Sequence, residues 1–178
     1  MNACKPRNSL LIMMLMVIFA ACNGSGQNNK SDGVDTSSTV TAEGIILEDD
    51  TLTNVLAAYM QLKDALVASD AKIAGEASDK LAENLKIIHG CENTAILAQE
   101  LANSNDLTLQ RTAFSTISKD LIAMYQHASL NSGEIYVMHC PMYNNKQGGD
   151  WLSTSAEIKN PYFGNEMLTC GTVIQEIK

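Results

Sequence analysis

The chain has 178 residues, of which 46% are hydrophobic and 18% charged, and its formal net charge is −8. This length allows one domain, with or without a tail. The acidic balance disfavours binding to phosphate backbones, and an aromatic content of 5% leaves few rings for stacking on bases. We therefore expect no nucleic-acid partner.

The N-terminal segment, residues 1–22, has the pattern of a bacterial secretory signal. Lys5 and Arg7 precede an unbroken apolar run from Leu10 to Ala20. This run is shorter than the about 20 residues that a membrane-spanning helix needs, and its length suits a signal peptide. It ends in the string FAAC, which resembles a lipobox, so we expect Cys22 to be acylated and to become the mature N-terminus. The alternative is an ordinary secretory signal cleaved just before that cysteine.

Residues 23–48 are predicted to be a flexible tether, because Gly, Ser, Asn and Thr dominate the stretch. The residues next to Cys22 form no acidic cluster of the kind that some lipoproteins of Bacteroidota carry as a surface-export signal. We therefore expect a protein of the cell envelope that faces the periplasm. Its membrane contact is then the N-terminal lipid and not a basic patch.

The residues after the tether are predicted to form amphipathic helices. The first helix begins after the polar string DDT at 49–51. The second begins at Ser69 or Asp70 and ends at Gly90, where a C-terminal helix cap is favoured. Apolar residues recur at helical spacing in both, and they are Leu52, Val55, Leu56, Tyr59, Leu62 and Leu66, then Ile73, Ala77, Leu81, Leu85 and Ile88.

Two further helices follow. One runs from about Glu92 to Ala102, and the next begins at Asn105 or Asp106. Because the connections are short, neighbouring helices should be antiparallel, and we predict a four-helix bundle over about residues 51–132. The faces expected to be buried in these two helices comprise Ile96, Leu97 and Leu101, then Gln110, Phe114, Ile117, Leu121, Met124 and Tyr125.

The last part of the chain, about residues 133–178, is predicted to be a small irregular α+β segment that completes a single domain over 49–178. Glu134–Met138 and Gly171–Ile177 have the composition of strands and can pair as a short β-hairpin, whereas Asn144–Asp150 reads as a turn. A segment this small needs the helices to pack on, or a covalent or metal staple. The fold class is therefore mainly α.

The string MHCPM at 138–142 is the strongest candidate for chemistry. Pro141 favours extended backbone at Cys140, and in an extended chain alternate residues share a face. Met138 and Cys140 should then point to one side and His139 to the other.

A second sulfur string lies further along, where Met167 and Cys170 are three residues apart, a spacing that one helical turn brings to one side. If the two strings meet, thiolates, thioethers and an imidazole converge, and such donors favour Cu(I) or another soft ion. The candidate metal ligands are Cys140, Cys170, Met142, Met167 and His139. The alternative is a structural disulfide between Cys140 and Cys170, which would close a loop of about 30 residues and contribute roughly 3–4 kcal/mol.

The strings YVMHCPMYNNKQGGDWLS and IKNPYFGNEMLTCG, together with QRTAFSTIS on the fourth predicted helix, resemble the domain of unknown function 3347 family of Bacteroidota. That family occurs as lipoproteins and fused to periplasmic adaptors of heavy-metal efflux pumps. The resemblance implies copper or a related ion as ligand, and an efflux adaptor or a metal chaperone as partner. Met138 departs from the family, which often has a polar residue there, so it is the weakest candidate ligand.

Enzyme motifs are absent from the sequence: it contains no GxSxG, HExxH, Gly-rich phosphate loop or CxxCH. His139 and Cys140 are neighbours on a predicted strand and should point apart, which is unsuitable for a nucleophile and its base. We therefore expect a binding module and not an enzyme. The less favoured alternative is a disulfide-stapled interaction domain of an envelope complex.

Overall fold

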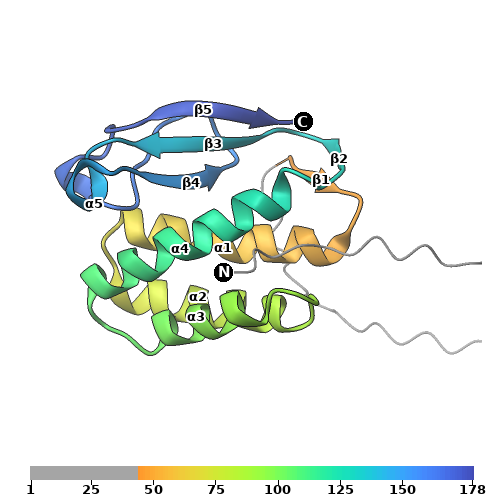
Figure 1. Cartoon of the computed structure of the whole chain (residues 1–178), viewed down its shortest axis with the longest axis horizontal. Coiled ribbons are helices and arrows are strands. Elements are labelled where there is room, and N and C mark those ends of the chain that lie inside the picture. Colours follow the sequence, from red (N-terminus) through yellow and green to blue (C-terminus); the bar gives the residue numbers. More distant parts are fainter. Residues whose placement is uncertain (1–43) are drawn as a thin grey trace, which may run out of the picture. The chain divides into compact units, whose positions relative to one another are not determined.

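The computed structural model describes residues 44–178 (Figure 1). The signal at 1–22, the acylation of Cys22 and the tether up to residue 43 lie outside the described residues. The described part is mainly helical, with small antiparallel sheets, as the sequence predicts. Within residues 44–178, no helix is long and apolar enough to cross a membrane.

Four helices occupy the predicted positions, and three of them begin at an aspartate whose carboxylate accepts a backbone N–H of the first turn. Asp49 accepts from Thr51, Asp70 from Ile73, and Asp106 from both Thr108 and Leu109. The helices are α1 (Asp50–Val67), α2 (Ala71–Lys86), α3 (Glu92–Ala102) and α4 (Leu107–Tyr125).

Two residues that were predicted to be buried are exposed, and the interface between α2 and α3 is built from small side chains. Ile73 and Ile96 are 45% and 58% exposed. Ala95 and Ala98 are buried instead, and a Cβ added to Gly75 would lie 3.0 Å from the Ala102 carbonyl oxygen. Such a close approach of the two backbones leaves no room for isoleucine. Helix α2 also ends at Lys86, four residues before the predicted end at Gly90.

The predicted boundaries of the tether and of the helical region need correction. Strand β1 (Ile46–Leu47) pairs antiparallel with strand β2 (Leu130–Ser132). Ile45 and Leu47 are buried, so residues 45–48 belong to the folded domain and not to the tether. The helical region accordingly ends at Tyr125, where α4 ends, because the chain then enters β2.

The C-terminal segment forms a three-stranded antiparallel sheet and not the predicted two-stranded hairpin. Strand β3 (Ile135–Cys140) lies in the centre, flanked by β4 (Gly149–Ser153) and β5 (Thr172–Ile177). Pairing of β3 with β5 is as predicted, but β4 begins inside the expected turn. The short helix α5 (Tyr143–Lys146) and the 3-10 helix η1 (Gly164–Glu166) lie in the connections.

Helices α1 and α4 lie between the sheet and the helices α2 and α3 (Figure 1). Tyr59 of α1 joins the two layers: its ring stacks on Phe114 of α4, and its hydroxyl bonds Ser118 at 2.7 Å and accepts the Leu152 N–H of β4 at 3.2 Å. Because β4 is an edge strand, this bond also protects part of its edge. The sheet is thereby fixed on the helices.

Candidate functional site

The structure brings Cys140 and Cys170 into contact, as the sequence predicts. Cys140 is the last residue of β3, and Cys170 lies in the turn before β5. Their Sγ atoms are 3.4 Å apart. Cys140 is fully buried and Cys170 is half-buried, so one thiol of the pair is accessible from solvent.

The local chain explains this meeting. Pro141 follows Cys140 and has no N–H to continue the ladder, so β3 ends there. The Cys170 N–H donates to the Met167 carbonyl at 3.0 Å and closes a turn, in place of the helical turn expected at 167–170. Because β3 and β5 pair antiparallel, the last residue of β3 and the first residue of β5 lie next to each other at the same end of the sheet.

Cys140 affects the ionisation of the Cys170 thiol. The hydrogen bond with Cys140 raises the pKa of Cys170, and burial and the charge of an ionised Cys140 act in the same direction. The backbone N–H of Met142 faces the Cys170 sulfur and opposes this shift. A second thiolate beside the first is therefore costly unless a cation compensates the charge.

His139 is held away from the thiols. Its Nδ1 lies 2.7 Å from Oδ1 of Asp150, the residue opposite it on β4, and its Cε1 and Nε2 atoms lie against Gly148. Being next to Cys140 on a strand, it points to the other face of the sheet, as predicted. Within residues 44–178, no group of three or more His, Cys, Asp or Glu side chains has the arrangement of a metal site.

The predicted methionines occupy different environments. Met138 is fully buried opposite Trp151 on β4, which suits the core. Met142 is 44% exposed and Met167 is half-buried, and both are linked to Cys170 through their backbones. The backbones of these two methionines are thus anchored beside Cys170.

Three residues that surround the pair were not recognised in the sequence as contributors to it. Trp151, the single tryptophan, is buried, and its ring lies against the backbone of Gly171, the residue after Cys170. Asp150 binds His139, and the buried Asn160 donates to the Cys170 carbonyl. The strings GGDW and NPYF contain these residues, but both read as turns, so the sequence offered no signal of their partners.

The donor set fits a soft ion. Two sulfurs bound at about 2.3 Å to one tetrahedral ion would lie roughly 3.8 Å apart, close to the 3.4 Å observed. A disulfide requires them to approach to about 2.05 Å. The site can thus accept an ion after a small opening, or form a disulfide after a larger closing.

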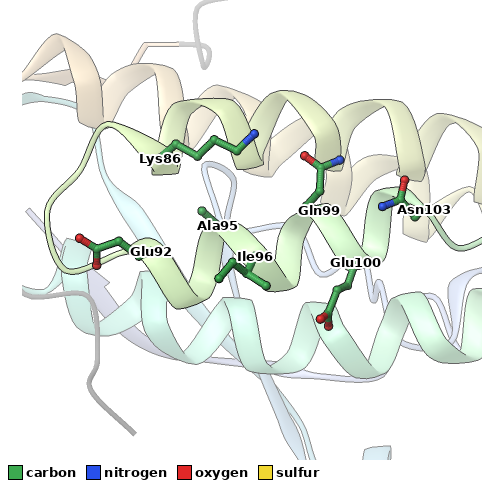
Figure 2. A pocket seen from close by; sticks show the side chains of 7 residues that line it. All are labelled: Lys86, Glu92, Ala95, Ile96, Gln99, Glu100 and Asn103. Carbon is green, nitrogen blue, oxygen red and sulfur yellow. The ribbon is translucent and has the colours of Figure 1, made fainter.

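A separate hollow of about 380 Å³ lies on the surface of α2 and α3 (Figure 2). It is lined by Lys86, Glu92, Ala95, Ile96, Gln99, Glu100 and Asn103. None of these side chains carries sulfur or imidazole, so the candidate site for a soft metal remains the cysteine pair.

The fold and the cysteine pair define a helical domain with a sheet that carries a dithiol. Residues 55–133 match the family described as Protein of unknown function (DUF3347). The match begins within α1, includes α2, α3, α4 and β2, and ends at Gly133, before the three-stranded sheet that carries Cys140. No curated protein and no solved structure matches the chain.

Proposed function

We propose that the protein is a lipid-anchored module, facing the periplasm, that binds a soft monovalent metal ion such as Cu(I) or Ag(I). The observation that supports this most is the 3.4 Å contact between the Cys140 and Cys170 sulfurs. Thiolates are the preferred ligands of such ions, and the half-exposed Cys170 gives an ion access to the buried partner. The cation would also offset the repulsion between the two thiolates.

Met142 and Met167 are the thioethers that we propose to complete the ligand set, because both adjoin Cys170. We leave His139 out of the set, since Asp150 holds its Nδ1. The bound ion would be cargo for a heavy-metal efflux adaptor or a metal chaperone. We further propose that α1–α4 form an antiparallel bundle that serves as a scaffold.

The same contact favours one alternative, a disulfide-stapled interaction domain that binds no metal. The two sulfurs are already neighbours, and their bond would tie the end of β3 to the start of β5. An oxidising compartment would permit that bond.

Anaerobic titration separates these functions. The full chain, purified in detergent and reduced, is titrated with Cu(I) in the presence of a competing chelator. We expect one equivalent to bind tightly, Trp151 fluorescence to change with it, and Cys140→Ser or Cys170→Ser to abolish both signals. Met167→Leu should weaken binding, whereas Met60→Leu, a matched change buried in α1, should not. Absence of binding with both thiols reduced would leave the disulfide alternative.

The anchor is tested by Cys22→Ser, which should release the protein from membranes. A variant that still sediments with membranes after a salt wash would contradict the lipoprotein proposal.

A further inference from the structure

Asn160 has the densest set of hydrogen bonds in the connection between β4 and β5. It is fully buried, and its backbone N–H donates to the Leu168 carbonyl at 2.8 Å. Its own carbonyl accepts the Gly164 N–H at 3.0 Å. Its side-chain Oδ1 accepts the Tyr162 N–H at 2.8 Å, and its Nδ2 donates to the Cys170 carbonyl at 2.7 Å. These bonds span residues 160–170.

The side-chain amide suits these two partners in one orientation only. A backbone N–H requires the oxygen of the amide, and a carbonyl requires its nitrogen, so a flipped amide would lose both bonds. An aspartate would present a second acceptor to the Cys170 carbonyl, and a hydrophobic residue would satisfy neither group. Of these side chains, only that of asparagine satisfies both the Tyr162 N–H and the Cys170 carbonyl.

Asn160 fixes the backbone of Cys170. The N–H of Cys170 is fixed by Met167 and its carbonyl by Asn160, so the peptide groups on both sides of its Cα are held. Fixing both peptide groups sets the direction of the Cα–Cβ bond, and from this Cβ the Sγ atom lies 3.4 Å from the sulfur of Cys140. The connection is also held from outside, because Arg111 of α4 donates to the Pro161 carbonyl at 3.0 Å.

We propose that Asn160 is the positioning residue of the cysteine pair: it holds Cys170 in place before any ligand arrives. The pair then binds an ion, or closes to a disulfide, without first ordering the connection. Ordering each residue of the connection costs backbone entropy, so prior ordering makes the closing of the pair more favourable by a measurable factor. The inference depends on the proposed function only for the identity of the ion.

Thiol–disulfide equilibrium with glutathione tests the positioning without any metal. The protein dithiol and glutathione disulfide react to give the protein disulfide and two reduced glutathiones, so the two protein thiols are oxidised and one glutathione disulfide is reduced. The equilibrium constant reports how well the pair is held together before the bond forms. We expect Asn160→Ala to lower it at least tenfold, which corresponds to a rise of about 30 mV in reduction potential.

Two comparison variants exclude a merely structural effect. Asn160→Leu preserves the volume and removes the bonds, so it should lower the constant as much as Asn160→Ala; it also serves if the alanine variant fails to fold. Asn84→Ala removes a similar amide-to-carbonyl bond, from Asn84 of α2 to Asn54 of α1, and should leave the constant unchanged. If both Asn160 variants had the same thiol–disulfide equilibrium constant as the wild-type protein, the inference would be overturned. A lowered constant in a protein that binds no Cu(I) would sustain it and refute the proposed function alone.

Discussion

The hydroxyl of Tyr59 is the polar tie between the helices and the sheet, and Tyr59→Phe removes it while keeping the aromatic packing. The ring is fully buried and stacks on Phe114 with centroids 5.2 Å apart. The change therefore leaves the volume almost intact. What it removes is the partner of the Leu152 N–H and of the Ser118 hydroxyl.

The expected cost follows from the groups left behind. Ser118 lies within α4, so its hydroxyl can turn to a carbonyl one helical turn earlier and recover a bond. The Leu152 N–H cannot turn to another acceptor in this way, because it is fixed in an edge strand that lies against the helices. A buried donor without a partner costs about 1–3 kcal/mol. We expect Tyr59→Phe to lower the free energy of unfolding by that amount.

Urea unfolding, followed by far-UV circular dichroism and by Trp151 fluorescence, measures this loss. Adding Ser118→Ala to Tyr59→Phe should cost less than the sum of the two single changes, because the two hydroxyls are partners. Hydrogen exchange at the Leu152 amide should also become faster. If Tyr59→Phe lowered the free energy of unfolding by less than about 0.5 kcal/mol and left hydrogen exchange at Leu152 unchanged, the Tyr59 hydroxyl would not link the helices to the sheet.

Three further predictions concern the scaffold. Asp106→Ala should lower the free energy of unfolding by about 1 kcal/mol in urea titrations, because it removes the carboxylate that accepts two N–H groups at the start of α4. Leu101→Ala should cost about 2–5 kcal/mol and Ile96→Ala less than about 0.5 in the same assay, since Leu101 is 1% exposed and Ile96 58%; equal losses would contradict the α3 packing. Burial raises the pKa of Tyr59, Tyr125 and Tyr162, whereas unfolded phenols ionise near pH 10, so stability should be full below about pH 10 and fall as pH rises above it. Tyrosinate absorbance should then appear together with the loss of helical signal, and ionisation of all tyrosines before unfolding would contradict this.

The helices were predictable because their signals are local. Asp70 and Asp106 mark helix starts through bonds to residues two or three positions away, and the stripe on α4 needed only a period of 3.6. Ile96 was misplaced because its stripe gives no information on how closely a neighbouring helix approaches. That distance depends on Gly75, which lies on another helix.

In the sheet and the site, too, features with a local signal were predictable and features that depend on distant residues were not. The contact of Cys140 with Cys170 was predictable, since Pro141 ends one strand and two strand-like segments flank the pair. Strand β4 was missed because its first residues, Gly149 and Asp150, are turn formers, and only pairing with β3 makes them a strand. The choice of Asn160 as partner of Cys170 depends on the whole connection, which no spacing rule encodes.

Intact-mass analysis shows whether Cys140 and Cys170 hold a metal ion in the cell. For this measurement the protein is purified from copper-treated cells without reductant or added metal and is kept anaerobic. We predict the mass of the chain with Cys140 and Cys170 reduced, plus one Cu(I) and minus the protons that the ion displaces, and no such adduct in Cys170→Ser. A metal-free chain lighter by the two thiol hydrogens of Cys140 and Cys170, with the bond between them located by peptide mapping, would contradict it.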